Sequence, residues 1–233
     1  MPATTFSTAA RANDRLDGGV GADTLRGGAG NDHFIVDDMR DVVVEVEGAG
    51  FDTIFSLVKC TLLAQVERLV LIGSGNVGGT GNDLANIIDR QRRWNRLLGG
   101  GGIDRIDGGA GADLLAGGTR NDILTGGTGN DRFLFSSALS SVHNVDRITD
   151  FEHGSDQLLL SRTVFAGVGS TGPLAAAAFV LGSTAGDANN RIVYDAASGS
   201  LYYDADGNGA AAQVLFARLV PGTDLQASDL WVV

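Results

Sequence analysis

The sequence predicts an all-β fold in which short strands and turns stack as repeats, followed by a β-rich C-terminal region of different character. Three observations lead to this prediction. A nine-residue pattern, G-G-x-G-x-D-x-U-x with U apolar, recurs in 18–35 and in 99–134. Its phase continues into flanking segments that lack the glycines, and after residue 134 the pattern ends and aromatic residues concentrate. A fixed short period is the sequence signature of a stacked repeat.

The phase of the repeat is visible at two positions in each unit. The acid position falls on Asp14, Asp23, Asp32 and Asp41, and later on Asn86, Asn95, Asp104, Asp113, Asp122 and Asp131. The apolar position falls on Leu16, Leu25, Phe34 and Val43, and later on Ile88, Leu97, Ile106, Leu115, Leu124 and Phe133. Segments 9–17, 36–44, 81–89 and 90–98 are therefore degenerate copies. A glycine-rich acidic linker would not keep both phases.

The residue types in the repeat suit a hard cation. Glycine adopts positive φ and allows neighbouring backbones to approach closely, so a Gly-Gly start makes a sharp turn whose carbonyls face inward. Calcium takes about six to eight oxygen ligands, and each aspartate adds a carboxylate. The sequence therefore predicts several calcium ions (Ca2+) as the cofactor. The apolar residue must bury against the next turn, so the repeats are stable only when stacked.

The candidate metal ligands are the repeat aspartates and the turn glycines. The aspartates are Asp14, Asp23, Asp32, Asp41, Asp104, Asp113, Asp122 and Asp131. The glycines are Gly18, Gly19, Gly21, Gly27, Gly28, Gly30, Gly99, Gly100, Gly102, Gly108, Gly109, Gly111, Gly117, Gly118, Gly126, Gly127 and Gly129.

These nonapeptides resemble those of the RTX (repeats-in-toxin, hemolysin-type) calcium-binding family. The resemblance implies a right-handed parallel β-roll, in which two nonapeptides make one turn and calcium lies between successive loops on each side. It implies four aspartate pairs, which are Asp104 with Asp122, Asp113 with Asp131, Asp14 with Asp32, and Asp23 with Asp41. Pairs that use Asn86 or Asn95 lose a negative charge and are expected to be weaker.

The repeats depart from the pattern at two places. Arg120 replaces the third glycine of 117–125, and 90–98 reads RQRRWNRLL. Arginine fits positive φ poorly and brings positive charge to a cation site. Three interpretations of Arg90, Arg92, Arg93 and Arg96 stay open: a solvated loop, a reading frame slipped and restored over a few codons, or a patch for anionic glycans or lipid headgroups.

The chain divides into four regions on this pattern. Residues 9–44 form the first roll block and 90–134 the second. Between them, 45–89 is expected to continue the stack as a β-helix-like bridge, with strands in 51–56 and 66–73. Its carboxylates Asp52 and Glu67 are expected to be solvated rather than functional.

Residues 135–233 form the fourth region, a predicted β-rich cap. VDRITDFEHGSDQLLLSRTVF at 145–165 resembles the segment that follows the roll in serralysin-type proteins, which implies a cap over the open end of the roll. RIVYD at 191–195 and SLYYD at 200–204 predict a β-hairpin, and AQVLFARL a further strand. DADGNG at 204–209 matches the first half of an EF-hand loop, but Leu215 stands where the bidentate glutamate belongs. A hairpin turn is favoured, with an incidental calcium site as the alternative.

Composition limits the classes of function. A formal net charge of −11 argues against nucleic acid as a partner, and Cys60 has no second cysteine for an internal disulfide. No apolar run approaches the ~20 residues of a membrane helix. The N-terminus does not read as a signal peptide. The terminal SDLWVV is similar to the C-terminal type I secretion signal of many RTX proteins, and reads equally as a final strand. A secreted, extracellular protein is therefore expected.

The sequence offers no constellation for catalysis. It contains no H-E-x-x-H and no G-x-S-x-G, and His33, His143 and His153 are scattered and expected at the surface. We expect a non-enzymatic, secreted calcium-binding protein that folds on binding calcium and acts as a structural or surface-interaction protein. Its expected partners are type I secretion machinery and cell-surface or matrix polysaccharide. The alternatives are an export and stability module of a larger secreted enzyme, and a small enzyme with its site on the cap.

Overall fold

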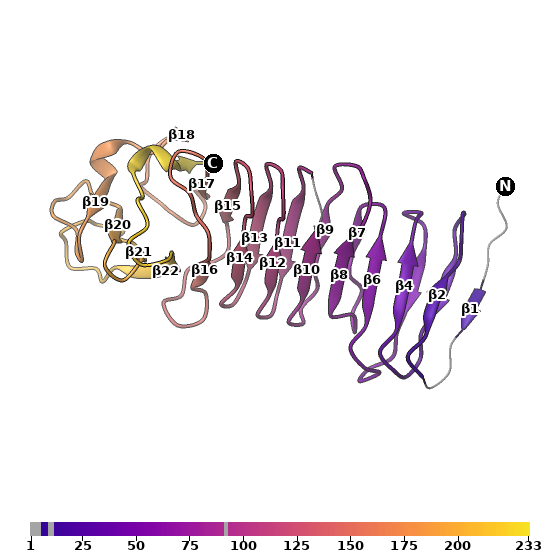
Figure 1. Cartoon of the computed structure of the whole chain (residues 1–233). Coiled ribbons are helices and arrows are strands. Elements are labelled where there is room, and N and C mark those ends of the chain that lie inside the picture. Colours follow the sequence, from indigo (N-terminus) through magenta and orange to yellow (C-terminus); the bar gives the residue numbers. More distant parts are fainter. Residues whose placement is uncertain (1–5, 9–11, 91–92) are drawn as a thin grey trace.

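The chain forms a long parallel β-roll that ends in a compact β-rich cap (Figure 1). The computed structural model describes residues 6–8, 12–90 and 93–233. The predicted all-β roll with a C-terminal cap is confirmed, and the described helices are two short 3-10 turns, η1 (Ala176–Ala178) and η2 (Ala227–Asp229). None of the helices among these residues is long and apolar enough to cross a membrane.

Along the roll, successive strands lie alternately in two sheets. The larger sheet contains, in spatial order, β2 (Arg15–Asp17), β4 (His33–Val36), β6 (Thr53–Ser56), β8 (Arg68–Leu71), β10 (Ile87–Arg90), β12 (Arg105–Asp107), β14 (Ile123–Thr125), β16 (Asp146–Ile148), β22 (Val214–Arg218), β21 (Ser200–Tyr203), β20 (Ile192–Asp195) and β19 (Phe179–Leu181). The second sheet contains β7 (Cys60–Thr61), β9 (Gly79–Thr80), β11 (Arg96–Gly100), β13 (Leu114–Gly118), β15 (Arg132–Phe135), β17 (Gln157–Leu160), β23 (Leu230–Val232) and β18 (Gly172–Pro173). A small separate sheet contains β1 (Phe6–Thr8), β3 (Thr24–Arg26) and β5 (Val42–Val44).

The strand register follows from the nine-residue repeat. Strands two units apart pair in parallel, so Ile88 lies beside Ile106, and Ile106 beside Leu124. In the second sheet Leu115 lies beside Phe133 in the same way. Two nonapeptides therefore make one turn, and each residue stacks on its equivalent 18 positions away.

The core is a pair of apolar columns between the sheets. Every apolar repeat position is buried, with side-chain exposures from 0% to 5%: Leu16, Leu25, Phe34, Val43, Ile88, Leu97, Ile106, Leu115, Leu124 and Phe133. Full burial of one such side chain contributes about 1.5–3 kcal/mol, so a three-residue strand is held by its neighbours above and below.

Residues 45–89 lie in the same stack although they lack nonapeptides. Strand β6 pairs with β4 on one side and with β8 on the other, and β8 pairs with β10. The second sheet is different, because β5 ends the small sheet and β7 begins the eight-stranded one. An apolar groove of about 210 Å³, lined by Val36, Val43, Ile54 and Leu63 among others, lies at this interruption.

The cap continues both sheets of the roll and then closes them. Strand β16 receives β22 in parallel, and β17 receives β23 in parallel. The two predicted hairpins are confirmed, because β20 with β21 and β21 with β22 pair antiparallel. Phe165 packs edge-to-face against both Tyr203 and Phe216, with ring centroids 5.3 Å and 5.0 Å away. This aromatic cluster gives the cap a core of its own.

Arg120 occupies the turn position where other repeats have glycine, and it adopts a φ of 91°. The equivalent glycines also have positive φ, for example 91° at Gly102 and 135° at Gly111. A side chain in this region strains the backbone by about 1–3 kcal/mol. The stacked turn imposes the conformation, and glycine removes the strain.

Arg120→Gly should therefore stabilise the folded chain by about 1 kcal/mol, after the extra backbone entropy of glycine in the unfolded state is subtracted. Arg120→Ala, which keeps the Cβ, is the matched control and should give no gain. The free energy of unfolding by urea, measured with saturating calcium, checks this. Equal stabilities of the glycine and alanine variants would contradict it.

Candidate metal centre

The repeat aspartates form two ladders that run along the sides of the roll. In each ladder one carboxylate oxygen accepts the backbone N–H of the equivalent residue on the previous turn. Asp122 Oδ1 accepts the Asp104 N–H at 2.8 Å, and Asp131 Oδ1 accepts the Asp113 N–H at 2.8 Å. In the first block Asp32 Oδ1 accepts the Asp14 N–H at 2.8 Å.

The four aspartate pairs implied by the RTX resemblance are all in contact across neighbouring turns. The remaining pair is Asp23 and Asp41, with the Asp23 N–H 3.0 Å from Asp41 Oδ1. The asparagines join the same ladders, because Asn86 and Asn95 donate their N–H groups to Asp104 and Asp113 at 2.8 Å and 2.7 Å. The asparagines occupy the geometric place of an aspartate without its charge.

The second oxygen of these carboxylates is the chemically informative one. Five buried carboxylates have an Oδ2 with no hydrogen-bond partner among the described residues: Asp32, Asp52, Asp104, Asp122 and Asp131. Their exposures are 0% or 1%. A buried charge without a partner is strongly unfavourable, and such groups normally neutralise, pair or bind metal. The residues present therefore fit a cation that is shared between turns.

The first glycine of each repeat makes room for this second oxygen. A Cβ on Gly126 would lie 2.6 Å from Asp131 Oδ2, and one on Gly108 would lie 2.9 Å from Asp113 Oδ2. Gly18, Gly27, Gly99 and Gly117 lie equally close to the aspartate five residues later. A larger residue would occupy the space beside the oxygen.

The other predicted glycines shape the turn rather than face the carboxylate. These other predicted glycines all have positive φ, and they are Gly19, Gly21, Gly28, Gly30, Gly100, Gly102, Gly109, Gly111, Gly118, Gly127 and Gly129. Several lie against the carbonyl of the previous turn, as Gly129 does against Gly111. The sharp turns and the close stacking both favour glycine, and Arg120 adopts the same positive φ only with strain.

Burial raises the pKa of several of these acids. The pKa of Asp104 is raised to about 7, and the pKa values of Asp122 and Asp131 are each raised to about 6. Loss of solvation is the main cause in each, opposed by the backbone N–H that each accepts. The pKa of Asp146 is raised well above its ordinary value by burial and by the nearby charge of Asp122.

Sequence reasoning placed Asp52 and Glu67 in solvent, and this is wrong. Asp52 is completely buried, and its Oδ1 accepts the Asp32 N–H at 2.7 Å. Glu67 is half-buried, and its Oε2 accepts the Asp52 N–H at 2.8 Å. Both continue the ladder of the larger sheet through the bridge. The nine-residue phase missed them because the ladder steps here are 20 and 15 residues.

The ladders also continue into the cap. Asp146 Oδ1 accepts the Asp122 N–H at 3.1 Å, and Asp156 Oδ1 accepts the Asp131 N–H at 2.9 Å. These steps are 24 and 25 residues long. The only sequence signal for them was the serralysin-like segment that contains both acids.

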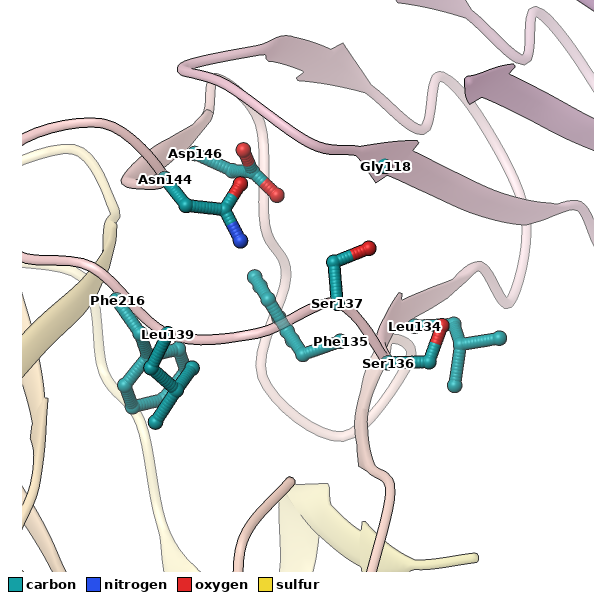
Figure 2. A pocket seen from close by; sticks show the side chains of 9 residues that line it. All are labelled: Gly118, Leu134, Phe135, Ser136, Ser137, Leu139, Asn144, Asp146 and Phe216. Carbon is teal, nitrogen blue, oxygen red and sulfur yellow. The ribbon is translucent and has the colours of Figure 1, made fainter. Parts of the chain in front are cut away.

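A small closed space marks the place where the roll meets the cap. Figure 2 shows Asn144 and Asp146 on one side of it, with Phe135 and Phe216 on the other. The cavity volume is about 10 Å³, close to the minimum for one water molecule. Asn144 Oδ1 is buried there without a hydrogen-bond partner among the described residues. This end of the ladder is therefore shielded from solvent.

The described part of the arginine-rich segment keeps the register of the repeat, with Leu97 beside Leu115. Asn95 is completely buried, while Arg93 and Arg96 are exposed and Trp94 is 48% exposed. The expected solvated loop fits the two exposed arginines. The side chain of Arg90 and the whole of Arg92 lie outside the described residues.

In the described chain, the three histidines and the 204–209 loop lie outside the aspartate ladders. His33 and His143 are exposed as expected, but His153 Nδ1 lies 2.7 Å from Oδ2 of the buried Asp229. This pair ties the start of the cap to its last strand, and Asp229 raises the pKa of His153. The 204–209 loop belongs to the hairpin connection between β21 and β22, where Asp204 accepts the Asp206 N–H and Asp206 accepts the Ala211 N–H.

The raised pKa values predict how stability depends on pH without calcium. A carboxyl whose pKa is raised by folding stabilises the fold below its unfolded value near 3.8, and that stability is lost as pH rises through about 6 to 7. The calcium-free chain should therefore be more stable at pH 4.5 than at pH 7.5. The folded fraction in calcium-free buffer, followed by circular dichroism across this range, measures it. Asp104→Asn should flatten the profile and Asp107→Asn should not, and rising stability with pH would contradict the assignment.

Comparison with known proteins identifies the family. The model of the family described as Peptidase M10 serralysin C terminal matches residues 12–232. Two solution structures from the Azotobacter vinelandii mannuronan C5-epimerase are similar. The AlgE6R3 subunit is 28% identical, with 64% of this chain and 78% of that chain covered and a TM-score of 0.44. The AlgE6R2 subunit is 22% identical, with 67% and 91% covered and a TM-score of 0.39. A search of curated proteins gave no match. The chain belongs to the Peptidase M10 serralysin C-terminal family, and its nonapeptides are RTX-type repeats.

Proposed function

We propose that this chain is a secreted calcium-binding repeat protein that folds when it binds calcium outside the cell. The observation that carries the proposal is that the buried Oδ2 atoms of Asp104, Asp122 and Asp131 have no hydrogen-bond partner in the described part of the chain. Each would hold calcium together with turn carbonyls of the neighbouring glycines. Bound calcium would supply the positive charge that the buried carboxylates lack.

Calcium would couple folding to the compartment. Extracellular calcium modules work at roughly 10⁻⁴–10⁻³ M, so sites of that class stay largely empty in the cytosol. Ions that bind only the folded roll shift the equilibrium towards it by mass action. The glycines add to the effect, because they lose much backbone entropy on folding.

Calcium-free chain should show a largely disordered circular dichroism spectrum at pH 7.5, and millimolar calcium should convert it to a β spectrum. The calcium concentration at the midpoint of folding should be about three- to ten-fold higher for Asp113→Ala than for Asp14→Ala. Asp113 is 1% exposed within an intact GGAGAD turn, whereas Asp14 is half-buried in a turn without leading glycines. If the wild-type spectrum does not change when calcium is added, the proposal is wrong. If the two variants have equal midpoints, the calcium ions lie in other turns than those proposed.

Type I secretion is the proposed route out of the cell. Family membership supports it, and so does calcium-gated folding, because a chain that folds only outside does not slide back through a narrow channel. Full-length chain expressed with a matching exporter should appear in the medium, and an exporter with an inactive ATPase should retain it inside. Equal extracellular amounts in both hosts, without release of a cytosolic marker, would contradict this route.

The proposed activity is structural or adhesive rather than enzymatic. Exposed Arg93, Trp94 and Arg96 would be the contact for an anionic cell-surface or matrix polysaccharide, which a carbohydrate array would test. A second function is favoured by the description of the matching family as a C-terminal region of peptidases: a calcium-dependent export and stability module of a larger secreted enzyme. The complete reading frame of the gene distinguishes the two.

A further inference from the structure

The turn that enters the bridge carries a glutamate where the repeats have glycine. Strand β5 pairs with β3 so that Val44 lies opposite Arg26, which places Glu45 opposite Gly27, the first glycine of its repeat. A Cβ on Gly27 would meet both Glu45 Oε1 and Asp32 Oδ2. The Glu45 side chain therefore enters the space beside the Asp32 oxygen, where the other turns leave room.

Three carboxylates converge at this point. One oxygen each from Asp32, Glu45 and Asp52 lies within 4.8 Å of the others. Two oxygens bound to one calcium at about 2.3–2.6 Å lie at most about 5.2 Å apart, so the spacing suits a single ion. Magnesium usually keeps several waters and is bound through one or two carboxylates, so a cluster of three carboxylates suits calcium better.

The two aspartates give independent evidence that a ligand belongs here. Both are 0% exposed, and Oδ2 of each has no hydrogen-bond partner among the described residues. Their Oδ1 atoms are already engaged, by the N–H of Asp14 at 2.8 Å and by the N–H of Asp32 at 2.7 Å. These bonds hold both carboxylates in place, and the Oδ2 of Asp32 lies beside Glu45 Oε1, because a Cβ on Gly27 would meet both atoms. None of the ion pairs found in the described chain supplies a cation to either group.

We infer that Asp32, Glu45 and Asp52 form a calcium-class cation site that differs from the repeat turns and binds its ion more tightly. The inference rests on the proposed calcium binding for the class of cation. A repeat turn offers two aspartates to an ion, whereas this site offers three carboxylates, and ligand charge tunes calcium affinity. The site lies at the junction of the first block and the bridge, so its ion would join the two.

Equilibrium dialysis of the full chain over a series of free calcium concentrations tests the site. In the wild type one ion should bind at a free calcium concentration about ten-fold below that of the others. Glu45→Gln should move that ion into the weaker class and leave the rest unchanged. The matched control Glu47→Gln, at an exposed position two residues on, should bind like the wild type.

The outcomes separate this inference from the proposed function. If wild type binds calcium and Glu45→Gln gives the same isotherm, the three-carboxylate site is overturned and calcium binding by the repeats stands. If wild type binds no calcium, the proposed function itself fails. Magnesium competing as strongly as calcium for the first ion would overturn the cation class. Should Glu45→Gln not fold, Glu45→Gly, which restores the repeat residue, replaces it and should likewise lack the tight ion.

Discussion

The structure depends on burying acid side chains, replaced by asparagine at two positions, beside the backbone of the next turn. The apolar columns follow from the stacking, because each short strand buries one or two large apolar residues on those of the neighbouring turns. The buried acids of the ladders place the stronger constraint on the structure. One oxygen of each is satisfied by a backbone N–H, and that bond sets the spacing of the turns. At five positions the other oxygen is buried with no hydrogen-bond partner among the residues that the structure describes, and a charge there must be neutralised.

The register of the roll could be predicted because it repeats. The acid and apolar phases identify the same stacked neighbours that the strands adopt, from Leu16 beside Phe34 to Leu115 beside Phe133. The aspartate pairs follow from the same spacing of 18 residues. The hairpins of the cap were also predictable, since alternating strands such as 191–195 and 200–204 are separated by a short turn.

The rest of the site could not be predicted because its spacing is irregular. Asp52 and Asp146 occupy ladder positions, yet the steps leading to them are 20 and 24 residues. Extra residues in a turn bulge outwards and leave the stacked part unchanged, so spatial periodicity survives where sequence periodicity does not. Glu45 is harder still, because its place opposite Gly27 depends on the pairing of β3 with β5. The solvent exposure predicted from the sequence is therefore wrong for Asp52 and Glu67 in the bridge.

The interruption between β5 and β7 has a mechanical consequence. Units of a stacked repeat are coupled only to their nearest neighbours, and along most of this roll two sheets carry that coupling. At the bridge the larger sheet runs through β4, β6 and β8, whereas the partner sheet ends at β5 and begins again at β7 in the described chain. On one side of the roll, strand pairing between neighbouring turns is thus absent at this level of the described chain. A load applied along the axis would concentrate there, so the first block would separate as a unit before the turns on either side came apart.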